Sequence, residues 1–253
     1  MDVALVIIVG LVLGSFLNVC IWRIPRGESI ASPPSHCGAC GTRLKPLDLV
    51  PVLSYVFLGG RCRYCRARIS LRYPIVEILT AALLTCLYIH TGLSWFFGFY
   101  GALFIVLTAV SFIDLDHQII PDSLVIAGVA IGLVMNIAGA GIGIVDGLLG
   151  ALAGGGTLLL IALAALYIFK KEGMGGGDIK LMAMAGLFLG WKMTLLSLFL
   201  SVCAAAIVGI LLLALGKKKR QDAIPLGPFL SLGIVLAVFW GERLLSWYLT
   251  QFL

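Results

Sequence analysis

The sequence predicts an all-α, polytopic membrane protein with a small polar insertion after its first helix. The chain has 253 residues, of which 61% are hydrophobic and 12% charged, and its mean hydropathy is +1.10. That is too little polar surface to cover a soluble globule of this size. The apolar residues also form runs long enough to cross a bilayer, and the polar stretch at residues 23–72 is the one long interruption.

Apolar runs define the spans that we expect. A bilayer core about 30 Å thick takes roughly 20 residues per helix. The runs that fit are Val3 to Trp22, Pro74 to Ile89, Trp95 to Ile113, Leu124 to Gly139, Ile142 to Phe169 and Pro228 to Leu249. A further stretch, Ile179 to Leu215, is too long for one crossing, and we expect two helices hinged at Gly190 to Lys192. The expected total is about eight transmembrane helices.

Basic residues set the orientation of these spans. Residues 23–72 hold nine Lys or Arg, so the positive-inside rule places this insertion in the cytoplasm and the N-terminus outside. Two crossings between Ile179 and Leu215 place the run Lys217 to Arg220 in the cytoplasm as well. The net charge is +6, and the basic residues that carry it fall in short loops between apolar runs. This placement indicates contact with lipid phosphates and argues against nucleic acid as a partner.

Four of the seven cysteines form two pairs in the insertion. These are Cys37-Gly-Ala-Cys40 and Cys62-Arg-Tyr-Cys65, separated by 21 residues. The spacing is close to that of a four-thiolate zinc site, with Gly38 or Gly41 easing the tight turn. Two disulfides or a redox CxxC are the alternatives, but a cytosolic loop is kept reduced and so small a segment needs a metal to fold. Four thiolates leave no open position, which predicts a structural zinc.

Two aspartates stand where structural preference alone does not explain both. Asp114 follows the apolar run ending at Ile113, at a helix C-terminus, where the macrodipole disfavours an anion. Asp178 opens the next helix after a glycine run, where the alternative role of N-cap competes. Both lie at the same side and depth in the expected topology. Two carboxylates that share a site keep one proton between them and can activate water for amide hydrolysis, so we predict a catalytic pair.

Glycines and other polar residues surround this pair. Gly175, Gly176 and Gly177 precede Asp178 and would let an extended substrate backbone approach closely. The remaining candidates have structural interpretations: Asp116 in a turn, Asp122 as a helix N-cap after Pro121, His117 and Lys180 near the site or at lipid phosphates, and Glu77 and Asp146 as packed polar contacts.

Ordered motifs along nearly the whole chain resemble the type IV prepilin peptidase family, whose members are GxGD-type intramembrane aspartyl peptidases. The matching stretches are Gly14 to Val19, the paired CxxC motifs, Pro51 to Tyr55, Gly60 to Cys62, Arg72 to Glu77, Ile113 to His117, Pro121 to Asp122, Gly175 to Lys180 and Ile224 to Pro228. Small departures occur at Leu47 to Val50 and at Val125.

The resemblance implies a function and an organisation. Asp114 and Asp178 would be the catalytic aspartates, cutting type IV prepilin and pseudopilin precursors at the cytoplasmic face of the bacterial inner membrane. The new amine would then be N-methylated with S-adenosylmethionine, although no residue pattern identifies the methyl-donor site. The expected parts are a first transmembrane helix over 1–22, a cytoplasmic zinc-binding domain over 23–72 and a membrane-embedded aspartyl peptidase domain over 73–253.

Three other classes share some of these features. A presenilin-like protease would have the GxGD element but lack the paired CxxC motifs. An ion-coupled transporter would more often hold its acidic residues near the membrane midplane. A zinc-dependent scaffold would tolerate Asn at both aspartate positions. The cysteine pairs together with aspartates at the membrane edge favour the peptidase.

Overall fold

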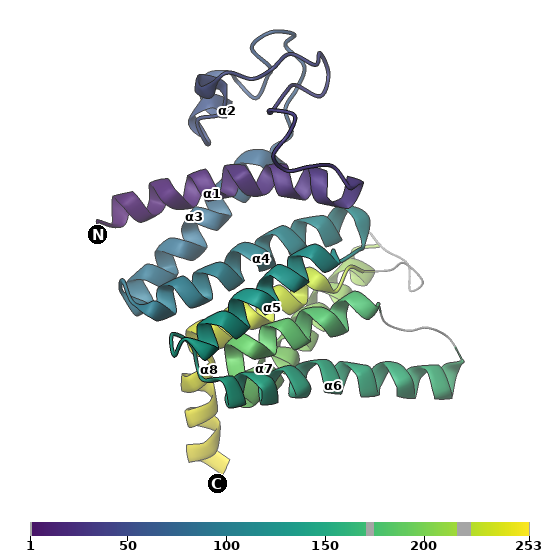
Figure 1. The fold of residues 1–253 in the computed structure, drawn as a ribbon. Coiled ribbons are helices and arrows are strands. Elements are labelled where there is room, and N and C mark those ends of the chain that lie inside the picture. The colour runs from purple at the N-terminus through teal and green to yellow at the C-terminus, as the bar shows by residue number, and fades with distance from the viewer. Residues whose placement is uncertain (1, 171–174, 217–223, 253) are drawn as a thin grey trace. The chain divides into compact units, whose positions relative to one another are not determined.

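A computed structural model describes residues 2–170, 175–216 and 224–252 (Figure 1). Over these ranges the chain is helical, with two isolated β-bridges near the cysteines, which confirms the all-α class. The helices are α1 (Val3–Arg23), α2 (Leu53–Phe57), α3 (Arg72–Thr91), α4 (Trp95–His117), α5 (Asp122–Ile137), α6 (Ile144–Phe169), α7 (Gly176–Ala214) and α8 (Gly227–Phe252), with short 3₁₀ turns η1 (Ile24–Arg26) and η2 (Pro46–Asp48).

The chain divides into two compact units, residues 1–97 and 98–253. In the first unit α1 packs along α3, and glycines bring the two backbones together. A Cβ at Gly10 would lie 2.6 Å from the Ala81 Cα, and one at Gly14 would lie 2.6 Å from the Glu77 Cα. The cysteine module is the insertion between these two helices. The expected three-part division at residues 22 and 72 stays a prediction.

The second unit is a bundle in which α7 packs against α5, α6 and α8. Aromatic contacts join α4 to the same bundle, because the ring of Phe99 lies 4.6 Å from that of Phe188 on α7 and Phe104 lies 5.7 Å from Phe239 on α8. The α4 residues in these contacts, Phe99 and Phe104, are fully buried. This packing holds the first half of α4 in the bundle.

Helix α7 is interrupted at Gly190, where the backbone turns to φ 70° and ψ 170°. A left-handed φ of this kind favours glycine and breaks the helical hydrogen-bond ladder. The Asn136 side chain of α5 donates to the Leu187 carbonyl at 2.8 Å, just before the break, and so satisfies a backbone acceptor there. Trp191 and Lys192 follow the break and are exposed. The expected hinge at Gly190 is confirmed.

Six helices in the described part of the chain are long and apolar enough to cross a membrane. They are α1, α3, α4, α6, α7 and α8, and α5 is a shorter apolar helix. The expected total of eight requires α5 and each arm of the kinked α7 to cross separately, and it stays a prediction. Lys171 and the run Lys217 to Arg220, which bear on orientation, lie outside the described residues.

We predict that Gly186→Ala on α7 destabilises the second unit. A Cβ there would overlap the Gly150 carbonyl of α6, and overpacking of this kind costs about 1–3 kcal/mol. The free energy of unfolding in detergent is the measurement. Gly156→Ala on α6 is the matched control, because nothing lies within 4 Å of a Cβ at that position. Equal stability of the two variants would contradict the prediction.

Candidate active site and cysteine cluster

Asp114 lies in the last turn of α4 and is only 5% exposed. A carboxylate buried among apolar helices and near a helix C-terminus is unfavourable on both counts. The backbone N–H of Gly227 donates to the Asp114 Oδ2 atom at 2.8 Å. Gly227 is the first residue of α8, so an N–H at the positive end of another helix offsets the unfavourable position.

Gly227 also provides room for this carboxylate. A Cβ at residue 227 would lie 2.7 Å from the Asp114 Oδ2 and 3.1 Å from its Cγ. Any other residue would therefore displace the carboxylate or the start of α8. In the sequence, Gly227 belongs to a motif shared with the family but has no predicted role. The pattern that could have pointed to it is the Gly-Pro pair at the start of a helix.

Asp178 lies in the first turn of α7, near the start of that helix. The expectation that Asp178 itself opens this helix is wrong, because α7 begins at Gly176 with Gly175 as N-cap, and this helix start has no side-chain cap hydrogen bond. The alternative role of N-cap for Asp178 is thereby removed. The Asp178 carboxylate is partly buried, and a Cβ added to Gly175 would lie 3.5 Å from its Oδ2 atom.

The glycines before Asp178 have different surroundings. A Cβ at Gly177 would lie 2.9 Å from the Ile120 Cβ in the turn between α4 and α5. Gly177 therefore allows the start of α7 to pack close to the end of α4. Nothing lies within 4 Å of a Cβ at Gly176, which leaves Gly175 and Gly176 as the candidates for close approach by a substrate.

The structure brings the two predicted aspartates together. Asp114 comes from the end of α4 and Asp178 from the start of α7, and they lie close enough for their charges to interact. The transporter alternative expects acidic groups near the middle of broken helices. Here both carboxylates lie within one turn of a helix end.

The other aspartates near this site have different positions. Asp122 was expected as a helix N-cap, but Pro121 is the N-cap of α5 and Asp122 is its first residue. The Asp122 Oδ1 accepts a hydrogen bond from the Lys180 Nζ at 2.8 Å, and both side chains are exposed. Asp116 is exposed on the last turn of α4. The ion pair joins the starts of α5 and α7.

The four paired cysteines form one cluster. Their Sγ atoms all lie within 4.8 Å of one another, and those of Cys37 and Cys65 are 3.8 Å apart. Zinc–sulfur bonds of about 2.3 Å place the sulfurs of a tetrahedral site about 3.8 Å apart, so the set fits such an ion.

The two cysteine motifs are structural repeats of each other, which the sequence reading did not identify. Each is a turn closed by an antiparallel bridge, His36 with Arg43 and Arg61 with Arg68. The residue after the second cysteine of each motif has a left-handed backbone, with φ 68° at Gly41 and φ 61° at Arg66. Gly41, and not Gly38, is thus the glycine that the turn requires.

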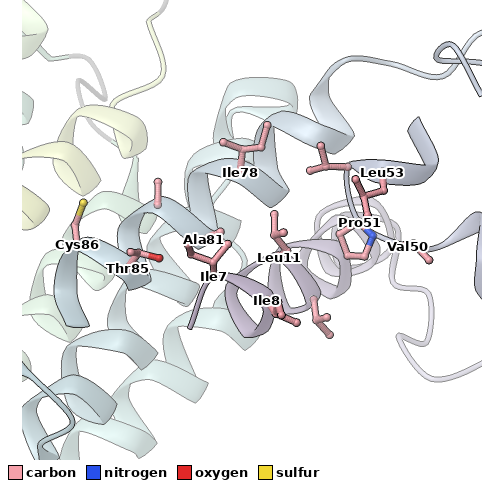
Figure 2. Close-up of a pocket in the computed structure, with 13 residues that line it drawn as sticks. Ile7, Ile8, Leu11, Val50, Pro51, Leu53, Ile78, Ala81, Thr85 and Cys86 are labelled. Carbon is pink, nitrogen blue, oxygen red and sulfur yellow. The ribbon is translucent and has the colours of Figure 1, made fainter. Parts of the chain in front are cut away.

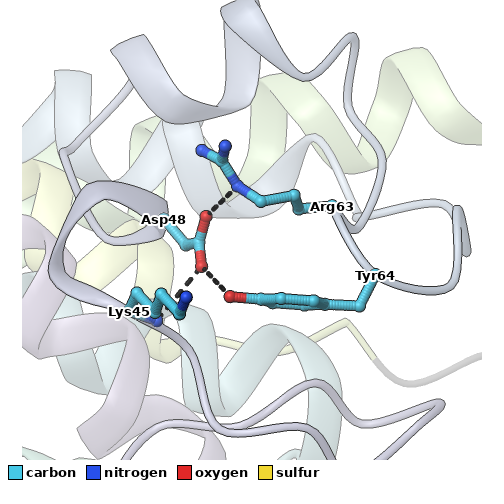
Figure 3. Close-up of polar contacts among 4 residues, drawn as sticks. All are labelled: Lys45, Asp48, Arg63 and Tyr64. Atoms are coloured by element: carbon cyan, nitrogen blue, oxygen red, sulfur yellow. Dashed lines mark hydrogen bonds and ion pairs between the residues drawn. The ribbon is translucent and has the colours of Figure 1, made fainter.

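Asp48 links the segment between the motifs to the second motif (Figure 3). Its carboxylate accepts hydrogen bonds from the Arg63 Nε at 2.6 Å, the Tyr64 hydroxyl at 2.9 Å and the Lys45 N–H at 3.1 Å. Burial opposes the charge, yet the hydrogen bonds from Arg63, Lys45 and Tyr64 hold the pKa of Asp48 below its ordinary value. Since Arg63 and Tyr64 lie between Cys62 and Cys65, Asp48 orients that motif.

Fold and site together define an all-helical, multi-pass membrane protein with a four-cysteine module and two carboxylates at helix ends. Residues 8–91 match the model of the bacterial peptidase A24 N-terminal domain, and residues 101–210 match the type IV leader peptidase family. No solved structure gives a significant match to the chain.

Curated relatives match nearly the whole chain. One from Aeromonas hydrophila is 37% identical, covering 99% of this chain and 94% of its own. Relatives from Pseudomonas aeruginosa and Legionella pneumophila are each 35% identical, covering 96% and 94% of this chain and 92% and 91% of their own. Each is named prepilin leader peptidase/N-methyltransferase. The chain belongs to the type IV leader peptidase family, which confirms the resemblance seen in its motifs.

Proposed function

We propose that this protein cleaves the basic leader from type IV prepilins and pseudopilins and N-methylates the new N-terminus. The observation that carries the peptidase activity is that Asp114 and Asp178 lie at two helix ends within electrostatic reach of each other, with Gly175 next to Asp178. The shared name of the relatives supports both activities and the precursor substrates, and favours them over a presenilin-like protease or a transporter.

The surroundings of the two carboxylates support different roles. The Gly227 N–H stabilises negative charge on Asp114, so Asp114 is the base that takes a proton from the attacking water. Asp178 lies within electrostatic reach of that charge and carries the shared proton, which it gives to the scissile carbonyl oxygen. When the C–N bond breaks, the proton on Asp114 passes to the leaving amine, and one hydroxyl of the tetrahedral intermediate returns its proton to Asp178, which restores the starting state of the pair.

The placement of the reaction follows the charge pattern of the chain. We place the protein in the bacterial inner membrane, with the cysteine module and the two aspartates on the cytoplasmic side. The nine basic residues of 23–72 support this orientation. A precursor with a basic leader and an apolar helix would have its junction at this membrane surface. S-adenosylmethionine is the methyl donor that the second activity requires.

We also propose that the cysteine module holds a structural zinc ion. Cys37, Cys40, Cys62 and Cys65 would hold it through four thiolates, and it would stabilise the module without taking part in the reaction. The mutual Sγ distances support this assignment, as do the paired turns that present two sulfurs each. Binding of the ion would stabilise the folded form of a segment that has little hydrophobic core of its own.

We expect Asp114→Asn and Asp178→Asn each to lower prepilin cleavage by about 10⁴-fold or more, because each removes one member of the proton-transferring pair. Cleavage of a synthetic precursor by the purified protein in nanodiscs, followed by mass spectrometry, is the measurement. The substitutions are nearly isosteric, and thermal unfolding checks that each variant is folded.

Asp116→Asn and Asp122→Asn are the matched controls for that experiment. Both residues lie close to Asp114 in sequence and both are exposed, so each variant should cleave within a few fold of the parent. A folded Asp178→Asn protein that cuts at the parental rate would remove Asp178 from the catalytic pair.

We expect Gly227→Ala to lower kcat with little change in KM. The new Cβ would displace the Asp114 carboxylate from the Gly227 N–H, and a hydrogen bond to a charged group is worth about 1.5–3 kcal/mol. That energy corresponds to roughly 10- to 150-fold in kcat. Gly98→Ala, on the same helix as Asp114 and with nothing within 4 Å of its Cβ, should leave kcat unchanged. Parental kcat in a folded Gly227→Ala protein would disprove this role.

We expect Gly41→Ala to weaken zinc binding while Gly38→Ala does not. Both positions are open to a Cβ, but residue 41 alone of the two has a left-handed φ, which costs an L-residue about 1–2 kcal/mol. The loss corresponds to roughly 5- to 30-fold in affinity. Competition for zinc with a chromophoric chelator measures it. Equal affinities in the two variants would show that the left-handed turn does not limit metal binding.

A further inference from the structure

The cysteine module exposes an unusual number of large apolar side chains. In helix α2, Ser54 and Tyr55 are partly buried. Leu53, Val56 and Phe57 are 55%, 65% and 84% exposed. The spacing i, i+3, i+4 places these three side chains on one side of the helix. We call the exposed set the apolar face; its members are Leu47, Leu49, Val50, Leu53, Val56 and Phe57.

The charges of the same module are almost all positive. Residues 23–72 contain nine Lys or Arg and two acidic residues, Glu28 and Asp48, and Asp48 is already hydrogen-bonded to Arg63. An apolar face on a basic module is the pattern of an element that lies in the membrane interface, because the cations can meet lipid phosphates.

A partly buried hydrogen bond holds the start of this face beside a membrane-spanning helix. The Val52 N–H donates to the Glu77 Oε2 at 2.7 Å, and the Ser15 hydroxyl bonds the same carboxylate. Glu77 is the sixth residue of α3, about 8 Å along the helix axis from Arg72. Residues 51–53 therefore lie beside α3 more than one turn beyond its first residue.

The backbone at Val52 is strained to reach this position. Its φ of 60° and ψ of −50° are rare for a β-branched residue. Such a conformation persists where surrounding contacts impose it, and the bond to Glu77 is one such contact. The strain is consistent with a segment held against the spanning helices and not left free in water.

An apolar groove continues from the face onto the lipid-facing surface of the same unit. Figure 2 shows this groove, which has a volume of about 630 Å³ and is lined by α1, α3 and Val50 to Leu53. Ile8 and Val12 of α1 and Ile78 of α3 are among its exposed lining residues. Val50 and Leu53 belong to both the groove and the apolar face, so the two form one apolar surface.

We propose that the apolar face lies in the membrane interface, with lipid acyl chains in the groove beneath it. The module then rests on the bilayer through Leu53, Val56 and Phe57 and is not suspended in the cytoplasm. The Val52 to Glu77 hydrogen bond sets its depth. This interaction does not depend on the proposed catalysis, and its test uses no activity measurement.

The test places a fluorinated phenylalanine at position 57 of the full-length protein in anionic nanodiscs. Fluorine NMR then compares relaxation by a lipid-soluble nitroxide with relaxation by a water-soluble gadolinium chelate. The lipid-soluble agent should dominate at position 57. The same label at position 39, on the exposed tip of the first cysteine motif, is the control and should respond mainly to the water-soluble agent.

Three results would overturn the proposal. Dominance of the water-soluble agent at position 57 would show that the face is hydrated. Protection from both agents would show that it is covered by protein. A hydrated label that becomes protected when a prepilin peptide is added would identify the face as a substrate-binding surface. Because the label is nearly isosteric with Phe57, misfolding does not confuse the outcomes at that position. At position 39 the label replaces an alanine, so thermal unfolding checks that this control is folded.

Discussion

The hydrogen bond from the Gly227 N–H to the Asp114 carboxylate is the interaction on which the candidate site depends. Asp114 is buried at the C-terminal end of an apolar helix, where both desolvation and the helix dipole oppose its charge. The start of α8 offsets both effects and must therefore lie at the end of α4. Because α8 packs on α7, the same constraint helps to place the start of α7 and Asp178.

The first unit uses the same solution for its own buried acidic residue. Glu77 accepts an N–H from Val52 in the insertion, as Asp114 accepts one from the start of α8. In both cases a glycine brings a neighbouring helix close to the acidic residue: Gly227 of α8 at Asp114, and Gly14 of α1 at Glu77. A backbone donor adds no charge or side chain to an apolar environment, so it satisfies the carboxylate without a second buried ion.

The sequence was sufficient for features that depend on local pattern or spacing. Runs of apolar residues predicted α1, α3 and α4 to within three residues at most ends, and the CxxC spacing predicted the cluster of four sulfurs. Features that depend on backbone contacts between distant segments were missed. The contact of Gly227 with Asp114 and the Lys180 to Asp122 pair have no periodic signal, because each depends on two segments that only the fold brings together.

The position of the aspartates at helix ends also bears on how a peptide could be cut. A peptide bond inside a helix is shielded by its own hydrogen bonds, so a substrate must be extended at the cleavage point. Helix α7 begins without a side-chain cap, and such a helix start leaves N–H groups for an outside acceptor. In the proposed reaction the carbonyl groups of an extended substrate are such acceptors. Gly176, with open space around it, lets that backbone approach, while Gly177 is already in contact with Ile120.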